Sequence, residues 1–112
     1  MAKHDLQVKP SVLEQLRQKK TLEVRLGHPW FSTIQAGDEV VFNQEFTRKI
    51  AYIRRYRSIK SAVACEDLAK IWPPFEGSEK AAKDLTKLLK HNLRGDVSKL
   101  GVLVFELAPL KE

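Results

Sequence analysis

A chain of 112 residues is long enough for one hydrophobic core but too short for two, so residues 1–112 are expected to form a single domain. Hydrophobic residues make up 43% and charged residues 30%, which excludes an intrinsically disordered chain. The formal net charge is +6 and the sequence pI is about 9.6, so a polyanionic partner is a reasonable expectation.

Cysteine usage and hydropathy narrow the expected location. The single cysteine, Cys65, excludes an internal disulfide, and no apolar run approaches the roughly 20 residues needed to cross a bilayer. The polar first residues lack the apolar core of a signal peptide. We therefore expect a cytoplasmic protein outside the membrane. The three histidines show no paired ligand spacing with Cys65 or with the acidic residues, so no metal is expected. No Walker or dinucleotide fingerprint occurs either, and no cofactor is expected.

The first predicted elements are a short helix and a strand. Ser11 and Glu14 fit a capping box, and the apolar spacing that follows predicts a helix ending near residue 18 or 19. Apolar and polar residues alternate along residues 21–26. This alternation predicts a strand with Glu23 and Arg25 on the face opposite the core.

A loop and a hairpin are predicted next. Trp30, Phe31 and Ile34 are expected to pack the loop onto the core before a turn at residues 36–38. Residues 39–43 and about 47–57 then predict two antiparallel strands.

The rest of the chain predicts helices followed by one strand. Residues 59–72 suit a helix, or a helix and a turn, that must end at the two following prolines. Ser78 is expected to cap a helix with a leucine stripe, and Gly95 to end it. Residues 101–107 predict a buried strand. This order of elements predicts an α+β fold, whose small twisted sheet often closes into a barrel.

Basic and aromatic residues interleave along the long strand, from residue 48 to Lys60 just beyond it. Strand parity predicts two sets of side chains on opposite faces: Tyr52, Arg54 and Tyr56 with Ile50, and Lys49, Arg55 and Arg57 with Ala51 and Ile53. Guanidinium groups and tyrosine rings on a sheet can hold phosphates and stack bases. A solvated strand whose tyrosines cover the edge of the core is an equally good interpretation.

Two further candidate sites contain acidic residues. Glu23 and Arg25 lie two apart on one strand face, close to Lys20, and such neighbours usually form a surface ion pair worth roughly 0 to 1 kcal/mol. Glu76 stands in the segment just before the predicted leucine-rich helix. It is either a loop carboxylate held over a pocket or, more commonly for such a position, a solvated acid.

Lys20, Glu23 and Arg25 have the spacing of the Gly-x-Lys-x-x-Glu-x-Arg signature of the ASCH domain family, which this chain resembles, although Gln18 stands where the signature has glycine. The resemblance continues through residues 34–42, 56–59, 73–74 and 101–104, and so covers nearly the whole chain. It implies a small PUA-like β-barrel flanked by helices. It also implies a cleft in which the signature lysine, glutamate and arginine point at RNA or a modified nucleoside.

Some bacterial ASCH proteins resemble amidohydrolases that act on N4-acetylcytidine with a lysine, a threonine and a glutamate. By position Lys20 matches the lysine and Glu76 could match the glutamate, but Glu23 stands in place of the threonine while Thr21 lies beside Lys20. The alternative to a binding module is therefore a nucleoside amidohydrolase that uses Lys20, Glu23 and Glu76.

Our interpretation of the sequence is an ASCH-type module that binds RNA or a modified nucleoside. The residues expected to bind the ligand are Lys20, Glu23, Arg25, Arg54, Arg55, Tyr56 and Arg57. A protein-interaction module with a basic face is a third possibility, and the sequence leaves the oligomeric state open.

Overall fold

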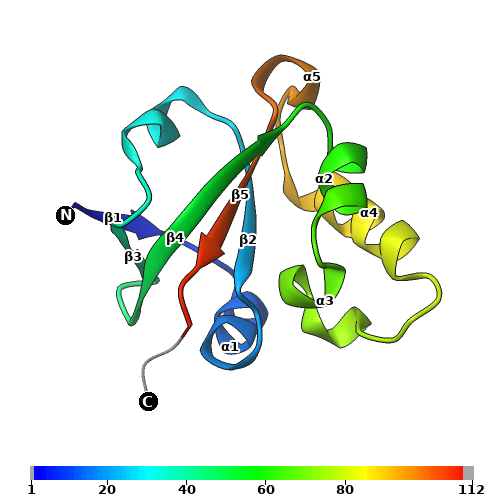
Figure 1. Cartoon of the computed structure of the whole chain (residues 1–112), viewed down its shortest axis with the longest axis horizontal. Coiled ribbons are helices and arrows are strands. Elements are labelled where there is room, and N and C mark those ends of the chain that lie inside the picture. Colours follow the sequence, from blue (N-terminus) through cyan, green and yellow to red (C-terminus); the bar gives the residue numbers. More distant parts are fainter. Residues whose placement is uncertain (1, 110–112) are drawn as a thin grey trace.

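The computed structural model describes residues 2–109, and one five-stranded sheet organises them (Figure 1). The strands are β1 (Lys3–Leu6), β2 (Leu22–Leu26), β3 (Glu39–Phe42), β4 (Phe46–Tyr56) and β5 (Val102–Leu107). Their order across the sheet is β1-β3-β4-β5-β2, with β1 parallel to β3 and all other neighbours antiparallel. The last strand of the chain therefore lies inside the sheet, between β4 and β2.

Helices cover both faces of this sheet (Figure 1). The α-helices are α1 (Pro10–Gln18), α2 (Ile59–Cys65), α3 (Leu68–Ile71), α4 (Ala81–Asn92) and α5 (Val97–Leu100), and two 3-10 helices are η1 (Pro29–Thr33) and η2 (Pro73–Phe75). Helix α1 packs on one face, while α2, α3 and α4 pack on the other. The described helices include none that is long and apolar enough to cross a membrane.

Strand β5 shows how the sheet separates two hydrophobic cores. Leu103 and Phe105 enter the core under α1, whereas Val102 and Val104 enter the core under α2 and α4. Successive strand residues point to opposite faces, so a strand covered on both sides consists almost entirely of apolar residues. The buried strand predicted at residues 101–107 is confirmed by this arrangement.

The structure confirms the α+β class, but the backbone does not close the sheet into the barrel that the resemblance implies. Strands β1 and β2 stand at the two edges, and no backbone ladder joins them within residues 2–109. A side chain bridges them instead, because Arg25 on β2 donates a 2.8 Å hydrogen bond to the carbonyl oxygen of Gln7, just after β1.

Both predicted N-terminal helix caps are wrong. Pro10 occupies the first position of α1 after Lys9, and no side chain caps that helix, so Ser11 lies inside it. Proline favours this position because its fixed φ angle suits the first helical turn and its missing N–H is not needed there. Ser78 accepts a hydrogen bond from the backbone N–H of Lys80 in the preceding turn, and α4 begins only at Ala81.

The predicted hairpin is confirmed, but Ile50 does not share a face with Tyr52, Arg54 and Tyr56 as simple parity predicts. Ile50 pairs with Leu107 and Tyr52 pairs with Glu106, which leaves Ala51 as an extra residue in a bulge. A bulge shifts the alternation by one residue. Ile50 therefore lies in the core under α1 together with Ile53, on the face opposite Tyr52, Arg54 and Tyr56.

Candidate functional site

A cavity of about 400 Å³ lies between β2, α4 and the segment that joins β1 to α1. Its apolar wall is formed by Val24, Ile71, Trp72, Leu85, Leu88 and Leu89. Lys20, Glu23 and Arg25 line the same cavity. The structure thus brings together in one concave site the three signature residues that the sequence places at the end of one helix and along one strand.

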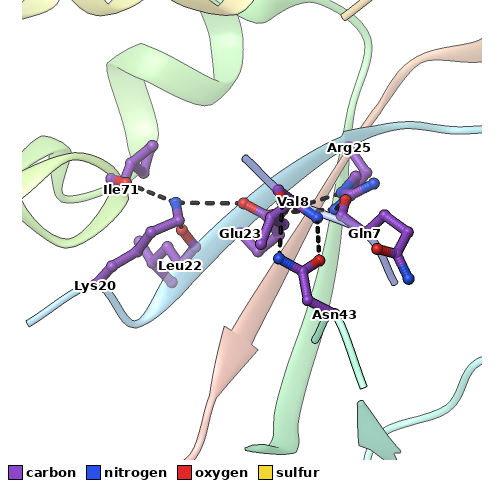
Figure 2. Close-up of polar contacts among 8 residues, drawn as sticks. All are labelled: Gln7, Val8, Lys20, Leu22, Glu23, Arg25, Asn43 and Ile71. Atoms are coloured by element: carbon purple, nitrogen blue, oxygen red, sulfur yellow. Dashed lines mark hydrogen bonds and ion pairs between the residues drawn. The ribbon is translucent and has the colours of Figure 1, made fainter. Parts of the chain in front are cut away.

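Lys20 is a buried anchor at the base of the cavity. It is 3% exposed, and its ammonium group donates to the backbone carbonyl oxygens of Leu22 and Ile71, the latter at 2.6 Å (Figure 2). Its third contact is the Glu23 carboxylate, with Nζ 3.4 Å from Oε1. Burial lowers the pKa of Lys20, and the neighbouring Glu23 carboxylate opposes that shift. Two of the three N–H donors of the ammonium group therefore bond to backbone carbonyl oxygens, and the charge is balanced by the ion pair with Glu23.

Glu23 lies between two cations. Its Oε1 faces Lys20, and its Oε2 accepts hydrogen bonds from Nε and Nη2 of Arg25 at 3.1 and 3.0 Å (Figure 2). The residue is only 7% exposed, although it lies on the strand face predicted to point away from the core. It is buried because the segment after β1 also covers that face of β2. The pair is therefore not the open surface ion pair that is the common case for this spacing.

Among Lys20, Glu23 and Arg25, it is Arg25 that keeps a hydrogen-bond donor, its Nη1, available to a ligand. Its Nε and Nη2 are engaged by Glu23 and by the Gln7 carbonyl. Its Nη1 donates no hydrogen bond to any residue of the described chain, and the side chain is 23% exposed. The segment that receives Arg25 is itself fixed, because the Asn43 side chain exchanges hydrogen bonds of 2.8 and 2.9 Å with the backbone of Val8 (Figure 2).

Positive charge dominates the cavity. Besides Lys20 and Arg25, Lys9 and Arg94 line it, and Glu23 is its only carboxylate among the residues described. Lys9 also contacts the end of α4, where its Nζ lies 3.4 Å from Oδ1 of Asn92. A cavity with this balance favours a ligand that combines an apolar part with negative charge.

Two of the four strand residues predicted to bind a ligand, Arg54 and Tyr56, form contacts within the fold instead. Arg54 donates hydrogen bonds of 2.6 and 2.7 Å to Glu66 and one of 2.8 Å to Glu106, and the Tyr56 hydroxyl donates to Glu66. These contacts tie β4 to β5 and to the residue after α2. Tyr56 packs against the core under α2 and α4, as in the interpretation in which tyrosines cover the edge of the core, whereas Arg54 is held in ion pairs with Glu66 and Glu106.

The other arginines of the predicted basic strand have two different surroundings. Arg55 and Arg57 are exposed and line a separate open groove, outside the cavity. Arg48 is buried, and its guanidinium donates to the carbonyl oxygens of Leu16, Lys20 and Ala108. Arg48 is thus a structural residue rather than part of a basic surface.

The structure does not bring Glu76 to the triad. Glu76 is exposed in the loop after η2 and does not line the cavity. Thr21 is half-buried and does not line the cavity either. Among residues 2–109 no group of three or more histidine, cysteine, aspartate or glutamate side chains is placed to hold a metal ion.

Comparison with known proteins identifies the class of fold. No family model matches this chain, and no curated protein matches it. The fold is similar to that of the hypothetical protein PH0355, with a TM-score of 0.83 and 23% identity over 96% of this chain and 99% of that one. It is also similar to the solution structure of the protein PF0455 from Pyrococcus furiosus, with a TM-score of 0.77 and 20% identity over 98% and 99% of the two chains. These likenesses show a shared small α+β fold.

The Glu66 cluster predicts a defined sensitivity to acid. Hydrogen bonds from Arg54 hold the pKa of Glu66 below its usual value, so these contacts stabilise the fold at and above the ordinary carboxyl range. That stabilisation is lost as the pH falls through the lowered pKa of Glu66. We expect Glu66→Gln to lower the Tm at neutral pH and to remain closer to the wild-type Tm in acid.

Thermal unfolding between about pH 7 and pH 3 measures this difference. Glu106→Gln is the matched control, since Glu106 contacts the same arginine through a single, more exposed oxygen. A gap between wild type and Glu66→Gln that stays constant with pH would contradict the prediction.

Proposed function

We propose that this chain is an ASCH-type module that binds a nucleotide of RNA, or a modified nucleoside, in the cavity between β2 and α4. The observation that carries the proposal is the placement of Lys20, Glu23 and Arg25 in one cavity that also has an extended apolar wall. The signature spacing and the small α+β fold agree with this assignment.

The apolar wall supports a flat ring as the buried part of the ligand. A volume of about 400 Å³ lies within the ordinary range for small-molecule sites. The half-buried Trp72 and the leucines of α4 provide flat and apolar surface against which a base can pack. A planar heterocycle is the ligand part that uses such a wall best.

The polar side of the cavity supports recognition of the ring edge and of a phosphate. Arg25 offers the donors of its Nη1, and Glu23 fixes the plane of that guanidinium through two hydrogen bonds. Lys9 and Arg94 add positive charge to the same cavity. Lys20 acts through Glu23, because its ammonium group is buried, donates to two backbone carbonyl oxygens and forms an ion pair with that carboxylate.

Removal of the Arg25 charge should weaken nucleotide binding. We expect Arg25→Gln to reduce affinity for ribonucleoside monophosphates by about tenfold or more, since hydrogen bonds to charged groups contribute roughly 1.5 to 3 kcal/mol. Isothermal titration calorimetry with the common ribonucleoside monophosphates and N4-acetylcytidine measures this. Lys83→Gln is the matched control, because Lys83 is exposed on α4 and does not line the cavity.

Turnover assays separate this proposal from the amidohydrolase alternative. A binding module leaves N4-acetylcytidine intact, and three features support that outcome: the hydrogen bonds of Lys20 to two carbonyl oxygens, the carboxylate at position 23 and the position of Glu76 outside the lining of the cavity. Deacetylation by the wild-type protein at a rate lost in Lys20→Ala would replace the proposal with the hydrolase.

A further inference from the structure

The exposed aromatic ring of Trp30 lies shortly after the end of β2, outside the cavity. Trp30 in η1 is 69% exposed, although the loop that contains it is otherwise anchored by the buried Phe31 and Ile34. Its ring is held by neighbours on two sides. The His28 ring lies 4.6 Å from it at an interplanar angle of 32°, and the Phe31 ring meets it edge-on at 5.9 Å. Trp30 is therefore an oriented ring with a large open surface.

The guanidinium group of Arg55 is held in place near the loop that carries Trp30. Arg55 donates a 2.9 Å hydrogen bond from Nη1 to the carbonyl oxygen of Leu100. The same Nη1 lies over Gly27, where a Cβ atom would approach it to 2.8 Å. Because Gly27 directly precedes His28, the side chain of Arg55 lies beside the start of the loop that carries His28 and Trp30. A Cβ atom at position 27 would also lie 2.3 Å from the Leu100 carbonyl oxygen, so glycine at this position leaves room for both groups.

Positive charge continues from Arg55 along an open groove. Arg57 and Lys99 line this groove together with Arg55, and no acidic side chain of the described chain does so. None of the three cations forms an ion pair within residues 2–109. The carboxylate of Asp96, three residues before Lys99, is engaged in capping α5 and in a hydrogen bond with Ser98.

We propose that the surface formed by Trp30, His28, Arg55, Arg57 and Lys99, here called the Trp30 surface, binds single-stranded RNA. An unpaired base stacks on the open side of Trp30, and the cations contact the neighbouring phosphates. An oriented tryptophan beside unpaired cations suits a strand with accessible bases better than a duplex, whose bases are already stacked. The Trp30 surface shares no residue with the cavity, so it stands independently of the proposed nucleotide site.

A fluorescein-labelled twelve-nucleotide oligouridine tests this surface by fluorescence anisotropy. We expect Trp30→Ala to weaken binding by roughly 5- to 150-fold, the range for loss of one stacked base. Arg57→Ala and Lys99→Ala should each reduce the slope of log affinity against log salt by about 0.7. Tyr52→Ala is the aromatic control, because Tyr52 is 62% exposed but lies outside the groove, and Lys87→Ala is the charge control.

Two further measurements keep the surface and the cavity apart. Trp30→Ala should leave mononucleotide affinity unchanged, since that titration reports on the cavity. In the Trp72→Phe variant, Trp30 is the one remaining tryptophan. Addition of the oligonucleotide to this variant should quench the emission of Trp30. Equal affinities of Trp30→Ala and Tyr52→Ala for the oligonucleotide would overturn the proposal, as would duplex RNA that binds as tightly as the single strand.

Discussion

Replacement of Glu23 by alanine is expected to lower the free energy of unfolding by about 3 to 5 kcal/mol, the range for removal of one partner from a buried ion pair. The cost is large because Lys20 remains in the interior, 3% exposed, without its only carboxylate partner. Arg25 also loses two hydrogen bonds. Urea denaturation followed by circular dichroism measures the change.

A double substitution makes this test specific. Lys20→Met in the Glu23→Ala background removes the stranded charge, so the double variant should be more stable than Glu23→Ala alone. Glu14→Ala is the control for an exposed acid on α1. If Glu23→Ala costs no more than Glu14→Ala, the pair contributes no more than a surface ion pair.

Replacement of Arg48 by methionine is expected to cost about 3 kcal/mol or more. The guanidinium donates to the carbonyl oxygens of Leu16 and Ala108 at 2.9 and 2.8 Å and to that of Lys20 at 3.4 Å. Each buried polar group left without a partner costs roughly 1 to 3 kcal/mol. Methionine fills much of the space but donates no hydrogen bond, so the three carbonyl oxygens lose their shared donor. That donor connects α1, the residue Lys20 before β2 and the residue Ala108 after β5.

Conservative and neighbouring substitutions provide the comparison for Arg48. Arg48→Lys keeps one charged donor group and should fall between wild type and Arg48→Met. Lys49→Met changes the exposed neighbour on the same strand and should shift the midpoint of urea denaturation little. An Arg48→Met midpoint equal to that of Lys49→Met would show that Arg48 is not required for stability.

Periodicity predicts most of the fold because burial follows it. The alternation along residues 21–26 and the leucine spacing of α4 each have one face in a core, so both elements are predicted correctly. Strand β1 is missed because three of its four residues are polar and it runs along a sheet edge, parallel to β3. The short helix α5 is missed because it contributes no buried residue.

The site was predictable only in part, because local patterns do not show what covers a strand from outside. Parity places Glu23 and Arg25 on one face correctly, but Glu23 is buried by a segment far away in the sequence. Only the family spacing points to a cleft. Long-range contacts also decide the roles of the basic residues, since Arg48 reaches Ala108 and Arg54 reaches Glu106. The alternation of residues 48–57 separates Arg54 from Arg55 and Arg57 by face, but it does not show which of these side chains meet a carboxylate in the fold.

The proposed nucleotide site is tested most directly by an NMR titration of the 15N-labelled protein with ribonucleoside monophosphates and N4-acetylcytidine. The proposal predicts saturable amide shifts concentrated on cavity residues from β2 and α4, such as Val24, Arg25 and Leu89, and weakened in Arg25→Gln. Amides on the Trp30 surface should move only when an oligonucleotide is added. The absence of saturable shifts at millimolar ligand, or shifts that leave β2 and α4 unchanged, would contradict the assignment of this cavity as a nucleotide site.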